Sequence, residues 1–494
     1  MSKQEIVKVN ETLEGVFESE KVNLDSNSSK AKRIFNILLR KLPRLTAQDW
    51  MSIFEGMHAY ETIGKVNWKI HYKVAVVDLL IRCAKQNAFY LAKDGSKIYV
   101  YNGNYWIEVD EEIIKQFLKL TAESLGVPKW MSIESVFIDD LYRQLQSAGF
   151  FEKMEHRDDT LLNLSNGTLC ININGTKLEA FKPADFLTHQ LDFEYDPTSK
   201  NDLWLRFLDE VLPDLDTQRT LQQALGYLLV QDLKLEKAVF LYGTGANGKS
   251  IVFEVLHGIL NHEIFTNYSL ESLTNSSGYH RTNLNNKLIN YGTDISMKKI
   301  DHGIFKQLVS GEPIEVRQIY EKPFIMKKYA KLIFNLNKID DADVETTVGF
   351  FRRMVFIPFE VTIAPENQDK MLHKKLLKNK SGILNWLLEG IEEVVKNQEI
   401  FISKQCKDFL ENFRNESNLA IRFIQNINLI QSASETIRFQ VMYERFQQFC
   451  EKQGERSWTQ RIFNNELKKL GFQSTRKSDG FYWFAKTTSF YTTQ

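Results

Sequence analysis

Two short apolar runs, rich in aromatic and β-branched residues, stand out in the first third of the chain. Residues 97–101 and 104–109 have the composition of β-strands, and they flank Asn102 and Gly103, a pair favoured in tight hairpin turns. The pattern therefore predicts a β-hairpin. Apolar residues at helical spacing lie on both sides of it and predict helices over residues 74–84 and 111–120.

A second strand-rich stretch covers residues 161–178. It contains two further Asn-Gly turn pairs, at residues 166–167 and 174–175. Together with the hairpin, this stretch predicts an α+β domain over residues 31–196. The residues before it, 1–30, are polar and rich in Ser, Asn, Glu and Lys, so we expect a polar arm there.

The middle of the chain changes to an alternation of apolar strands and helices. After a predicted linker at residues 197–200, the pattern predicts helices over residues 203–211 and 219–230 and a strand over residues 238–242. Strands that alternate with helices are typical of an α/β domain with a central parallel sheet. We place this domain at residues 197–400.

The last part, residues 401–494, returns to helical spacing and ends in a compact pattern. Residues 439–452 and 459–470 predict two amphipathic helices, and residues 472–485 predict a hairpin that turns at Asp479-Gly480. We therefore predict a helical linker followed by a winged-helix domain. Such a domain binds either DNA or another protein. Its candidates for DNA phosphate contacts are Arg461, Lys468, Arg476 and Lys477.

Composition is that of a soluble globular protein and indicates little about partners. The chain has 494 residues, 43% of them hydrophobic, and 63 basic residues balance 63 acidic ones. Because the net charge is zero, any nucleic-acid site must be a local patch. No apolar run approaches the ~20 residues that span a bilayer, and the N-terminus resembles no signal peptide, so we expect a cytoplasmic protein without a membrane partner. The four cysteines are far apart and predict neither disulfides nor a zinc site.

One eight-residue run carries a specific chemistry. It fits the pattern G-x-x-x-x-G-K-[ST] at every fixed position and lies between the strand at 238–242 and helical spacing over residues 251–260. Its glycines let the backbone wrap around phosphate oxygens, and the start of the helix adds partial positive charge. The run predicts a nucleoside triphosphate site; a glycine-rich turn before an ordinary helix is the alternative. The residues predicted to bind the nucleotide are Gly243, Thr244, Gly245, Ala246, Asn247, Gly248, Lys249 and Ser250.

Three later strands carry polar residues suited to nucleotide hydrolysis. One apolar run ends in Asp294, which could position Mg²⁺ and water, and the next ends in Asn337, which could orient the attacking water. Arg352 and Arg353 precede a third. An arginine there can act across a subunit boundary on the charge of a transferred phosphoryl group, and a solvated pair is the alternative.

The order of these elements resembles that of the superfamily 3 helicases, which have an AAA+ core. It is most similar to the phage, plasmid and poxvirus primase-helicases, including replication initiators of staphylococcal mobile islands. The resemblance covers residues 161–359 and includes the stretches 163–169, 225–227 and 305–312. It implies ATP and Mg²⁺ as cofactors, single-stranded DNA as substrate, and a homo-hexamer with nucleotide between subunits.

The resemblance also implies roles for single residues. Lys249 and Ser250 would hold phosphate and Mg²⁺, Asp294 would be the acid of the second motif and a metal ligand, and Asn337 would be the sensor amide. Arg352 would be the arginine finger, with Arg353 as a rival because the register is ambiguous by one.

Contacts to the neighbouring subunit and to DNA are implied in the same way. Lys306 stands where the family often has a basic residue that contacts the neighbour's nucleotide. Residues 314–324 resemble the hairpin that grips single-stranded DNA in the hexamer channel. The DNA-contact candidates there are Lys322 at the tip, followed by Arg317, Lys327 and Lys328.

The sequence departs from the family pattern in one place and lacks a further module. Some members have two adjacent acids in the second motif, whereas Thr293 and Ile295 flank Asp294, so the general base stays open. A primase module would need paired metal-binding carboxylates. The N-terminal region offers Asp139 and Asp140 on a predicted helix and no D-x-D strand, so we expect no primase activity.

These patterns together predict an ATP-driven hexameric DNA helicase, moving 3′ to 5′, in replication or replication initiation of a phage, plasmid or genomic island. Origin duplex DNA and other replication proteins are further candidate partners. The alternative is an origin-binding or helicase-loading protein that uses ATP as an assembly switch. A phage-type nucleotide kinase ranks third because no acceptor site is evident.

Overall fold

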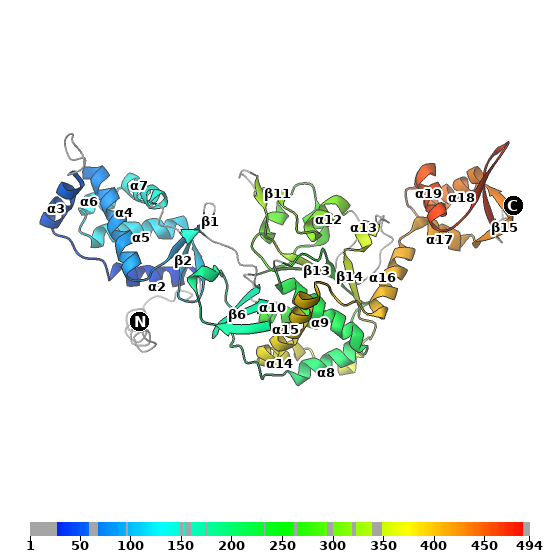
Figure 1. Cartoon of the computed structure of the whole chain (residues 1–494), viewed down its shortest axis with the longest axis horizontal. Coiled ribbons are helices and arrows are strands. Elements are labelled where there is room, and N and C mark those ends of the chain that lie inside the picture. The colour runs from blue at the N-terminus through cyan, green and yellow to red at the C-terminus, as the bar shows by residue number, and fades with distance from the viewer. Residues whose placement is uncertain are drawn as a thin grey trace. The chain divides into compact units, whose positions relative to one another are not determined.

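The computed structural model divides the chain into two compact units (Figure 1). The first comprises Met1–Cys170 and Lys177–Glu194, and the second comprises Ile171–Thr176 and Tyr195–Gln494. Each has a hydrophobic core of its own. The structure describes residues 27–58, 68–94, 97–148, 152–153, 160–172, 175–231, 233–260, 264–293, 300–318, 323–337 and 348–487.

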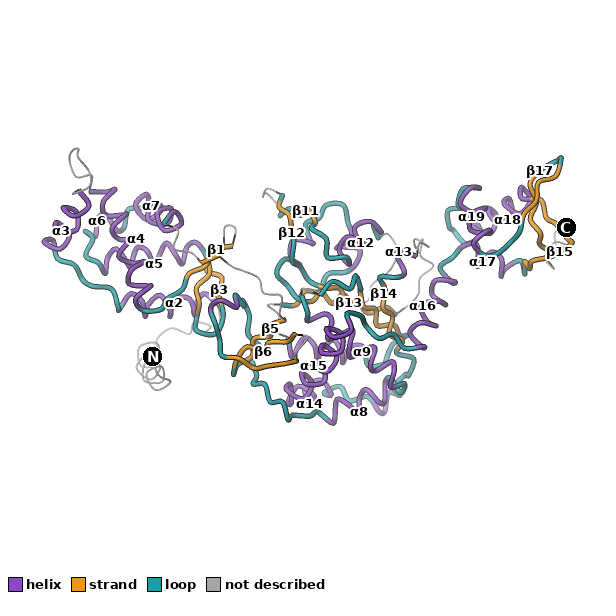
Figure 2. Tube along the Cα trace, in the orientation of Figure 1, coloured by secondary structure: helices purple, strands orange, loops and turns teal. Residues whose placement is uncertain are grey.

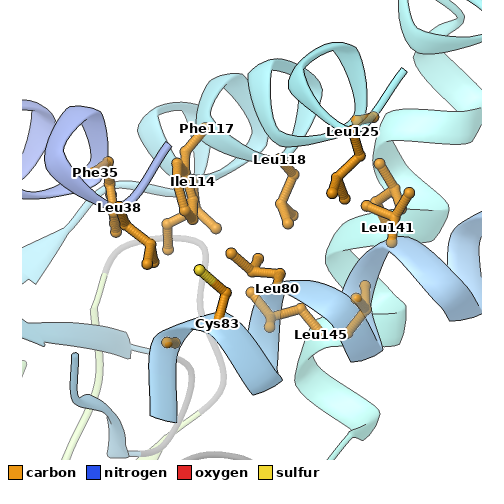
Figure 3. Close-up of a cluster of buried hydrophobic side chains, with 14 of the residues drawn as sticks. Phe35, Leu38, Leu80, Cys83, Ile114, Phe117, Leu118, Leu125, Leu141 and Leu145 are labelled. Atoms are coloured by element: carbon orange, nitrogen blue, oxygen red, sulfur yellow. The ribbon is translucent and has the colours of Figure 1, made fainter. Parts of the chain in front are cut away.

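Helices form most of the first unit. Apolar side chains of its longer helices converge in one core (Figure 3), where the rings of Phe35 and Phe117 stack with centroids 4.2 Å apart. Both helices predicted here are confirmed, although they extend beyond the predicted ends. The helices are α2 (Asn27–Leu39), α3 (Ala47–His58), α4 (Trp68–Gln86), α5 (Glu111–Ser124), α6 (Lys129–Ser132) and α7 (Ser135–Ser147).

The predicted hairpin is confirmed within a sheet of order β3-β2-β1-β4. The Asn102 carboxamide oxygen closes its turn by accepting from the backbone N–H groups of Asn104 and Tyr105, at 2.9 and 2.8 Å. Tyr99 and Trp106 are 4% and 0% exposed, so both rings pack in the core. The strands are β1 (Leu91–Asp94), β2 (Lys97–Tyr101), β3 (Trp106–Val109) and β4 (Glu152–Lys153).

The strand-rich stretch that follows forms a separate three-stranded sheet. Its order is β5-β6-β7, with strands β5 (Thr160–Leu164), β6 (Gly167–Asn172) and β7 (Gly175–Glu179). This confirms the strands expected over residues 161–178.

A five-stranded parallel sheet is the centre of the second unit, as predicted. Its order is β14-β8-β13-β10-β9, and all its neighbouring strands run parallel. Figure 1 shows α12 and α13 on one side of the sheet and α9, α10 and α15 on the other. The strands are β8 (Ala238–Tyr242), β9 (Phe265–Thr266), β10 (Ile289–Gly292), β13 (Lys331–Leu336) and β14 (Met354–Pro358).

Two of the covering helices approach each other closely. A Cβ on Gly390 of α15 would lie 2.5 Å from the Gln222 carbonyl oxygen of α9, and one on Gly226 would lie 2.9 Å from the Ile391 nitrogen. Only glycine therefore permits this distance between the backbones. The helices on this sheet are α8 (Asp202–Val211), α9 (Leu215–Leu229), α10 (Lys249–Ile259), α11 (Leu270–Thr274), α12 (His302–Val309), α13 (Val348–Phe351), α14 (Leu372–Leu376) and α15 (Lys380–Asn397).

The segment at residues 197–200, predicted as a linker, forms no helix or strand and is hydrogen-bonded to residues remote in sequence. Asn385 Nδ2 donates to the Asp196 and Ser199 carbonyls, at 2.9 and 2.8 Å, and the Ser199 hydroxyl donates to Asn379 Oδ1 at 2.8 Å. Polar residues in and next to this segment are therefore hydrogen-bonded to the start of α15.

The C-terminal part has a core of its own, and Figure 2 shows its strands beside its helices. The two predicted helices and the hairpin are confirmed. The pattern missed a ten-residue strand, β15, because only its first residue is buried and its burial does not alternate. The sheet order is β15-β17-β16. The elements are α16 (Lys404–Glu416), α17 (Leu419–Asn426), β15 (Leu429–Arg438), α18 (Phe439–Lys452), α19 (Gln460–Lys469), β16 (Ser474–Lys477) and β17 (Gly480–Thr487).

Candidate nucleotide site

The predicted phosphate loop connects β8 to the first turn of α10. Gly245, Ala246 and Gly248 have positive φ angles of 118°, 48° and 89°, which turn the backbone around the loop. A Cβ on Gly243 would lie 1.9 Å from Asn247 Nδ2, so only glycine fits at this position. The strand, loop and helix that the motif requires are all present.

Hydrogen bonds from two neighbouring strands hold the loop in place. The Gly243 N–H donates to the Leu336 carbonyl at the end of β13, at 3.1 Å. Asn247 Nδ2 donates to the Phe359 carbonyl just after β14, at 3.2 Å, and the Ile363 N–H donates to the Ala246 carbonyl at 2.7 Å. The loop therefore lies at the edge of the sheet where the parallel strands end.

Lys249 lies inside this loop. Its ammonium group is buried and donates to the Gly243 carbonyl at 2.6 Å and to Asn247 Oδ1 at 2.9 Å. Ser250, the next residue, is exposed in the first turn of α10. A glycine cradle, a helix N-terminus and a lysine in the loop fit the phosphates of a nucleotide. Ser250 could supply one oxygen ligand to Mg²⁺, and the second predicted ligand, Asp294, lies outside the described residues.

Two asparagines near the end of β13 have different surroundings. Asn335 is buried, and its Oδ1 accepts from the Tyr291 hydroxyl at 2.8 Å; complete burial raises the pKa of that hydroxyl far above its usual value. Asn337 is half-buried directly after β13, beside the carbonyl of Leu336 that holds the loop. The predicted sensor amide and the phosphate loop thus lie at the same edge of the sheet, and Asn335 belongs to the core.

The two candidate arginines precede β14 and differ sharply in burial. Arg353 is 11% exposed and donates to the Ser310 hydroxyl and, at 2.6 Å, to the Gly349 carbonyl. Arg352 is 59% exposed. Both contact Glu236, with nitrogen–oxygen distances of 3.1 Å from Arg352 and 3.0 Å from Arg353. The residue available to an outside partner is therefore Arg352.

Three residues around these arginines were missed by sequence reasoning. Glu236 accepts from both guanidinium groups, Lys237 donates to the Arg352 carbonyl, and Ser310 binds Arg353. The only signal was the charged run Lys234-Leu235-Glu236-Lys237 before β8, which is also typical of an ordinary solvated loop.

The hairpin predicted before the sensor strand is present. Strand β11 (Ile314–Val316) pairs in antiparallel fashion with β12 (Phe324–Met326). Lys322 lies outside the described residues. Arg317 is exposed, donates to the Tyr279 hydroxyl at 2.9 Å and lies over its ring. The remaining predicted basic residues follow β12 or lie on α12: Lys327 is exposed, and Lys328 and Lys306 are half-buried.

A pocket of about 300 Å³ with a mostly polar lining lies between α16 and the residue that follows Phe359. Phe409 of α16 forms part of its wall, and its ring centroid lies 4.7 Å from that of Tyr242, the residue before Gly243. Gln405 Nε2 donates to Glu360 at 2.9 Å across the same wall. The lining is completed by Lys404, Asp408 and Asn412.

The C-terminal basic residues are distributed over one helix and one hairpin. Arg461 and Lys468 are exposed on α19, seven residues apart and hence on one face. Arg476 is exposed on β16, and Lys477 donates to the Thr436 hydroxyl at 2.9 Å.

The described part of the chain has neither a cluster of metal-ligating side chains nor a membrane-spanning helix. It contains no group of three or more His, Cys, Asp or Glu side chains that could hold a metal ion. Asp139 and Asp140 each pair with a lysine, Lys115 at 2.6 Å and Lys73 at 2.9 Å. Within the same residues, no helix has the length and apolar character needed to cross a membrane.

Fold and loop together define a phosphate-loop α/β protein, and three segments match known families. Residues 78–213 match "D5 N terminal like", residues 392–492 match "Poxvirus D5 protein-like", and residues 241–353, which contain the whole loop, match a "Family of unknown function (DUF5906)". On both sides of the loop, the chain is therefore similar to D5-type proteins of the phage and poxvirus primase-helicase group, which supports the predicted branch.

Solved structures of the C-terminal region of NrS-1 are also similar. One is 13% identical and covers 82% of this chain and 98% of its own, with a TM-score of 0.46. A second is 14% identical and covers 83% and 99%, also at 0.46, and a third is 12% identical and covers 84% and 99% at 0.43. No protein of the curated set matches the sequence.

Proposed function

We propose that the chain is an ATP-driven DNA helicase of the AAA+ type that works as a ring, most simply a hexamer, in replication of a phage, plasmid or genomic island. The phosphate loop and the D5-type segments around it support this class of enzyme. The strand order β14-β8-β13-β10-β9, with the loop after β8, supports the AAA+ core.

The main support for this proposal is that Lys249 and Arg352 lie at opposite ends of the parallel strands. Strand β14 pairs with β8 from Met354 opposite Ala238 to Pro358 opposite Tyr242. Arg352 therefore precedes the first paired residue, whereas Lys249 follows the loop after the last. At about 3.3 Å per residue the strand alone separates them by about 16 Å. This separation supports action of Arg352 on a nucleotide bound by a neighbouring subunit.

In this proposal each residue near the loop has a separate role in ATP hydrolysis. Lys249 exchanges its hydrogen bond to the Gly243 carbonyl for one to a phosphate oxygen, and Ser250 contributes a metal ligand. Bound Mg²⁺ would neutralise charge on the phosphates. Asn337 orients the attacking water, and Asp294 is the proposed acid of the second motif. Arg352 of a neighbouring subunit stabilises the charge that develops on the transferred group.

The pocket beside α16 is our candidate for the nucleobase. It combines an aromatic ring, Phe409, with amide and carboxylate groups that can read the edge of a base. Exchange of Asp408 for Asn and of Asn412 for Asp should alter the preference between ATP and GTP. An unchanged preference in both variants would exclude this assignment.

DNA is proposed to contact the β11–β12 hairpin, with Lys322, Arg317, Lys327 and Lys328 as candidates. Movement from 3′ to 5′ is proposed from the family resemblance alone. Unwinding of forks with a single 3′ or 5′ tail tests the polarity, and ATPase activity with and without single-stranded DNA, paired with native mass in ATP, tests the class. A Lys249→Ala protein with undiminished ATPase activity would refute the mechanism.

The basic face of α19 favours a second candidate function. Arg461 and Lys468 are exposed on the helix that a winged-helix domain inserts into duplex DNA. An origin-binding or helicase-loading protein would use this face for sequence-specific duplex binding and use ATP only to assemble. Strong duplex binding without strand displacement in ATP would favour this second candidate.

A further inference from the structure

The short segment between α9 and β8 holds Glu236 in an unusual backbone conformation. Its φ angle is +55°, in the left-handed region that residues with side chains rarely adopt. Glycine or asparagine would be accommodated more easily there. Strained residues of this kind cluster at functional sites, so the contacts of the Glu236 carboxylate are of interest.

Two guanidinium groups converge on one oxygen of Glu236. Arg352 Nη2 lies 3.1 Å and Arg353 Nη2 lies 3.0 Å from Glu236 Oε2. Arg353 is anchored independently by Ser310 and by the Gly349 carbonyl. The side chains of Arg352 and Glu236 are 59% and 42% exposed, so their ion pair is open to solvent and is held only weakly.

A third cation lies beside this pair. Lys237 is half-buried, and its ammonium group donates to the Arg352 carbonyl. Burial lowers the pKa of Lys237, and the charges of Arg352 and Arg353 lower it further, with Glu236 acting in the opposite direction. The surroundings therefore disfavour the charged lysine, and an additional anion at this edge would reverse that effect.

We propose that Glu236 is a positioning residue that holds Arg352 at the sheet edge and releases it to a phosphate group of the neighbouring subunit's nucleotide, with Lys237 as a second cation that meets the same phosphate. This inference rests on the proposed action of Arg352 between subunits. A nucleotide phosphate offers more negative charge and more acceptor oxygens than one carboxylate, so it can displace Glu236 from Arg352.

The exchange has a consequence for assembly. Because Glu236 competes with the incoming phosphate, it weakens the contact between subunits until nucleotide is present. Neutralising the carboxylate should strengthen that contact, whereas neutralising Lys237 should weaken catalysis by the neighbour. If Glu236 and Lys237 had only structural roles, both substitutions would be expected to reduce activity.

Mixed rings test the exchange. Subunits with Arg352→Ala keep an intact loop and need an arginine from a neighbour, and subunits with Lys249→Ala supply one without hydrolysing ATP. ATPase activity is measured at a fixed concentration of the first while the second is titrated. We expect Glu236→Gln in the Lys249→Ala subunit to lower the half-maximal concentration about fivefold, and Lys237→Gln to lower the maximal rate at least tenfold.

Matched controls separate the effect of the charge from the effects of its position and of altered folding. Glu210→Gln on α8 and Lys396→Gln on α15 change the same charges at exposed positions and should leave the titration unchanged. Glu236→Asp keeps the charge on a shorter side chain and should give an intermediate half-maximal concentration. Association is also followed by sedimentation with a non-hydrolysable ATP analogue, and thermal unfolding is recorded for each variant.

The possible outcomes are distinguishable. If Lys249→Ala subunits rescue the others but Glu236→Gln leaves the half-maximal concentration unchanged or raises it, the role of Glu236 is overturned while the proposed function stands. A maximal rate unaffected by Lys237→Gln overturns the role of Lys237 in the same way. If no Lys249→Ala subunit rescues at any concentration, the action of Arg352 between subunits is itself overturned.

Discussion

Arg353 holds Ser310 with two of its nitrogens: Nε and Nη2 both donate to the serine hydroxyl, at 3.2 and 2.9 Å. The serine follows α12 and the arginine precedes β14, so the contact joins two elements that are far apart in the sequence. Because Arg353 is committed to this contact inside its own subunit, the neighbouring arginine, Arg352, is the one that can reach outward.

The two arginines should therefore respond differently to removal. We expect Arg352→Ala to leave thermal stability unchanged and to reduce ATPase activity by about 10³-fold or more, the usual effect of losing an arginine finger. Arg353→Ala should lower the free energy of unfolding by about 1.5–3 kcal/mol, because buried hydrogen bonds from a charged donor are lost. Steady-state ATPase assays and thermal melts check both. Equal loss of stability in the two variants would contradict this division.

The asparagines on and after β13 offer a second contrast. Asn335→Ala leaves the Tyr291 hydroxyl buried without its acceptor, which should cost about 1–3 kcal/mol of stability. Asn337→Ala should retain the melting temperature and lose hydrolysis. Combining Asn335→Leu with Tyr291→Phe removes both polar partners and should recover most of the stability lost on removing one. A double-mutant cycle in urea unfolding measures the coupling, and additive costs would refute it.

The sequence predicts the chemistry of the loop better than the side chains around it. Spacing alone identifies residues 243–250, because the motif encodes a backbone shape and the flanking strand and helix follow from apolar patterning. By contrast, Arg352 and Arg353 are indistinguishable in sequence, since both precede an apolar strand. Their roles separate only when Ser310, brought close by the packing of α12, buries one of them.

Elements with regular burial were also easier to predict than elements without it. The helix of residues 439–452 was predicted with its true bounds because one face is apolar. Strand β15 was missed because it lies at the edge of its sheet, is mostly exposed and has a register shift between Gln431 and Thr436. The hydrogen bonds between the segment at 196–199 and α15 could not be predicted, because α15 is remote in sequence.

The contact of α9 with α15 should tolerate no side chain at Gly390. In Gly390→Ala the new Cβ would lie 2.5 Å from the Gln222 carbonyl oxygen, which is backbone and cannot move aside alone. We expect a loss of about 1–3 kcal/mol, seen as a lower melting temperature. Gly56→Ala in α3 is the control: nothing lies within 4 Å of its Cβ, and alanine at this exposed position should stabilise the helix slightly. An unchanged melting temperature in Gly390→Ala would show that the helices can separate freely.

The cysteines should be protected from thiol reagents in the folded protein. All four are free and buried, and burial raises the pKa of Cys450 to about 11, with a further contribution from Glu455. A raised thiol pKa leaves little reactive thiolate at pH 8, where Cys450 should react at least about 100-fold more slowly than an exposed thiol. Labelling with a chromogenic disulfide, with and without urea, measures this rate. Fast labelling of Cys450 in the native protein would contradict its burial in the C-terminal core.

The exposed face of α19 carries the two basic residues proposed to contact DNA, Arg461 and Lys468. If this face contacts DNA phosphates, Arg461→Glu combined with Lys468→Glu should weaken duplex binding across all sequences. It should also reduce the slope of log affinity against log salt by about one for each lost contact. Lys452→Glu on α18 is the matched control, since it reverses one exposed charge in the same domain outside this face. Binding is measured by fluorescence anisotropy over a range of salt concentrations. A salt slope unchanged in the double variant would assign this domain to protein contacts, because charge reversal on a phosphate-binding face cannot leave counterion release intact.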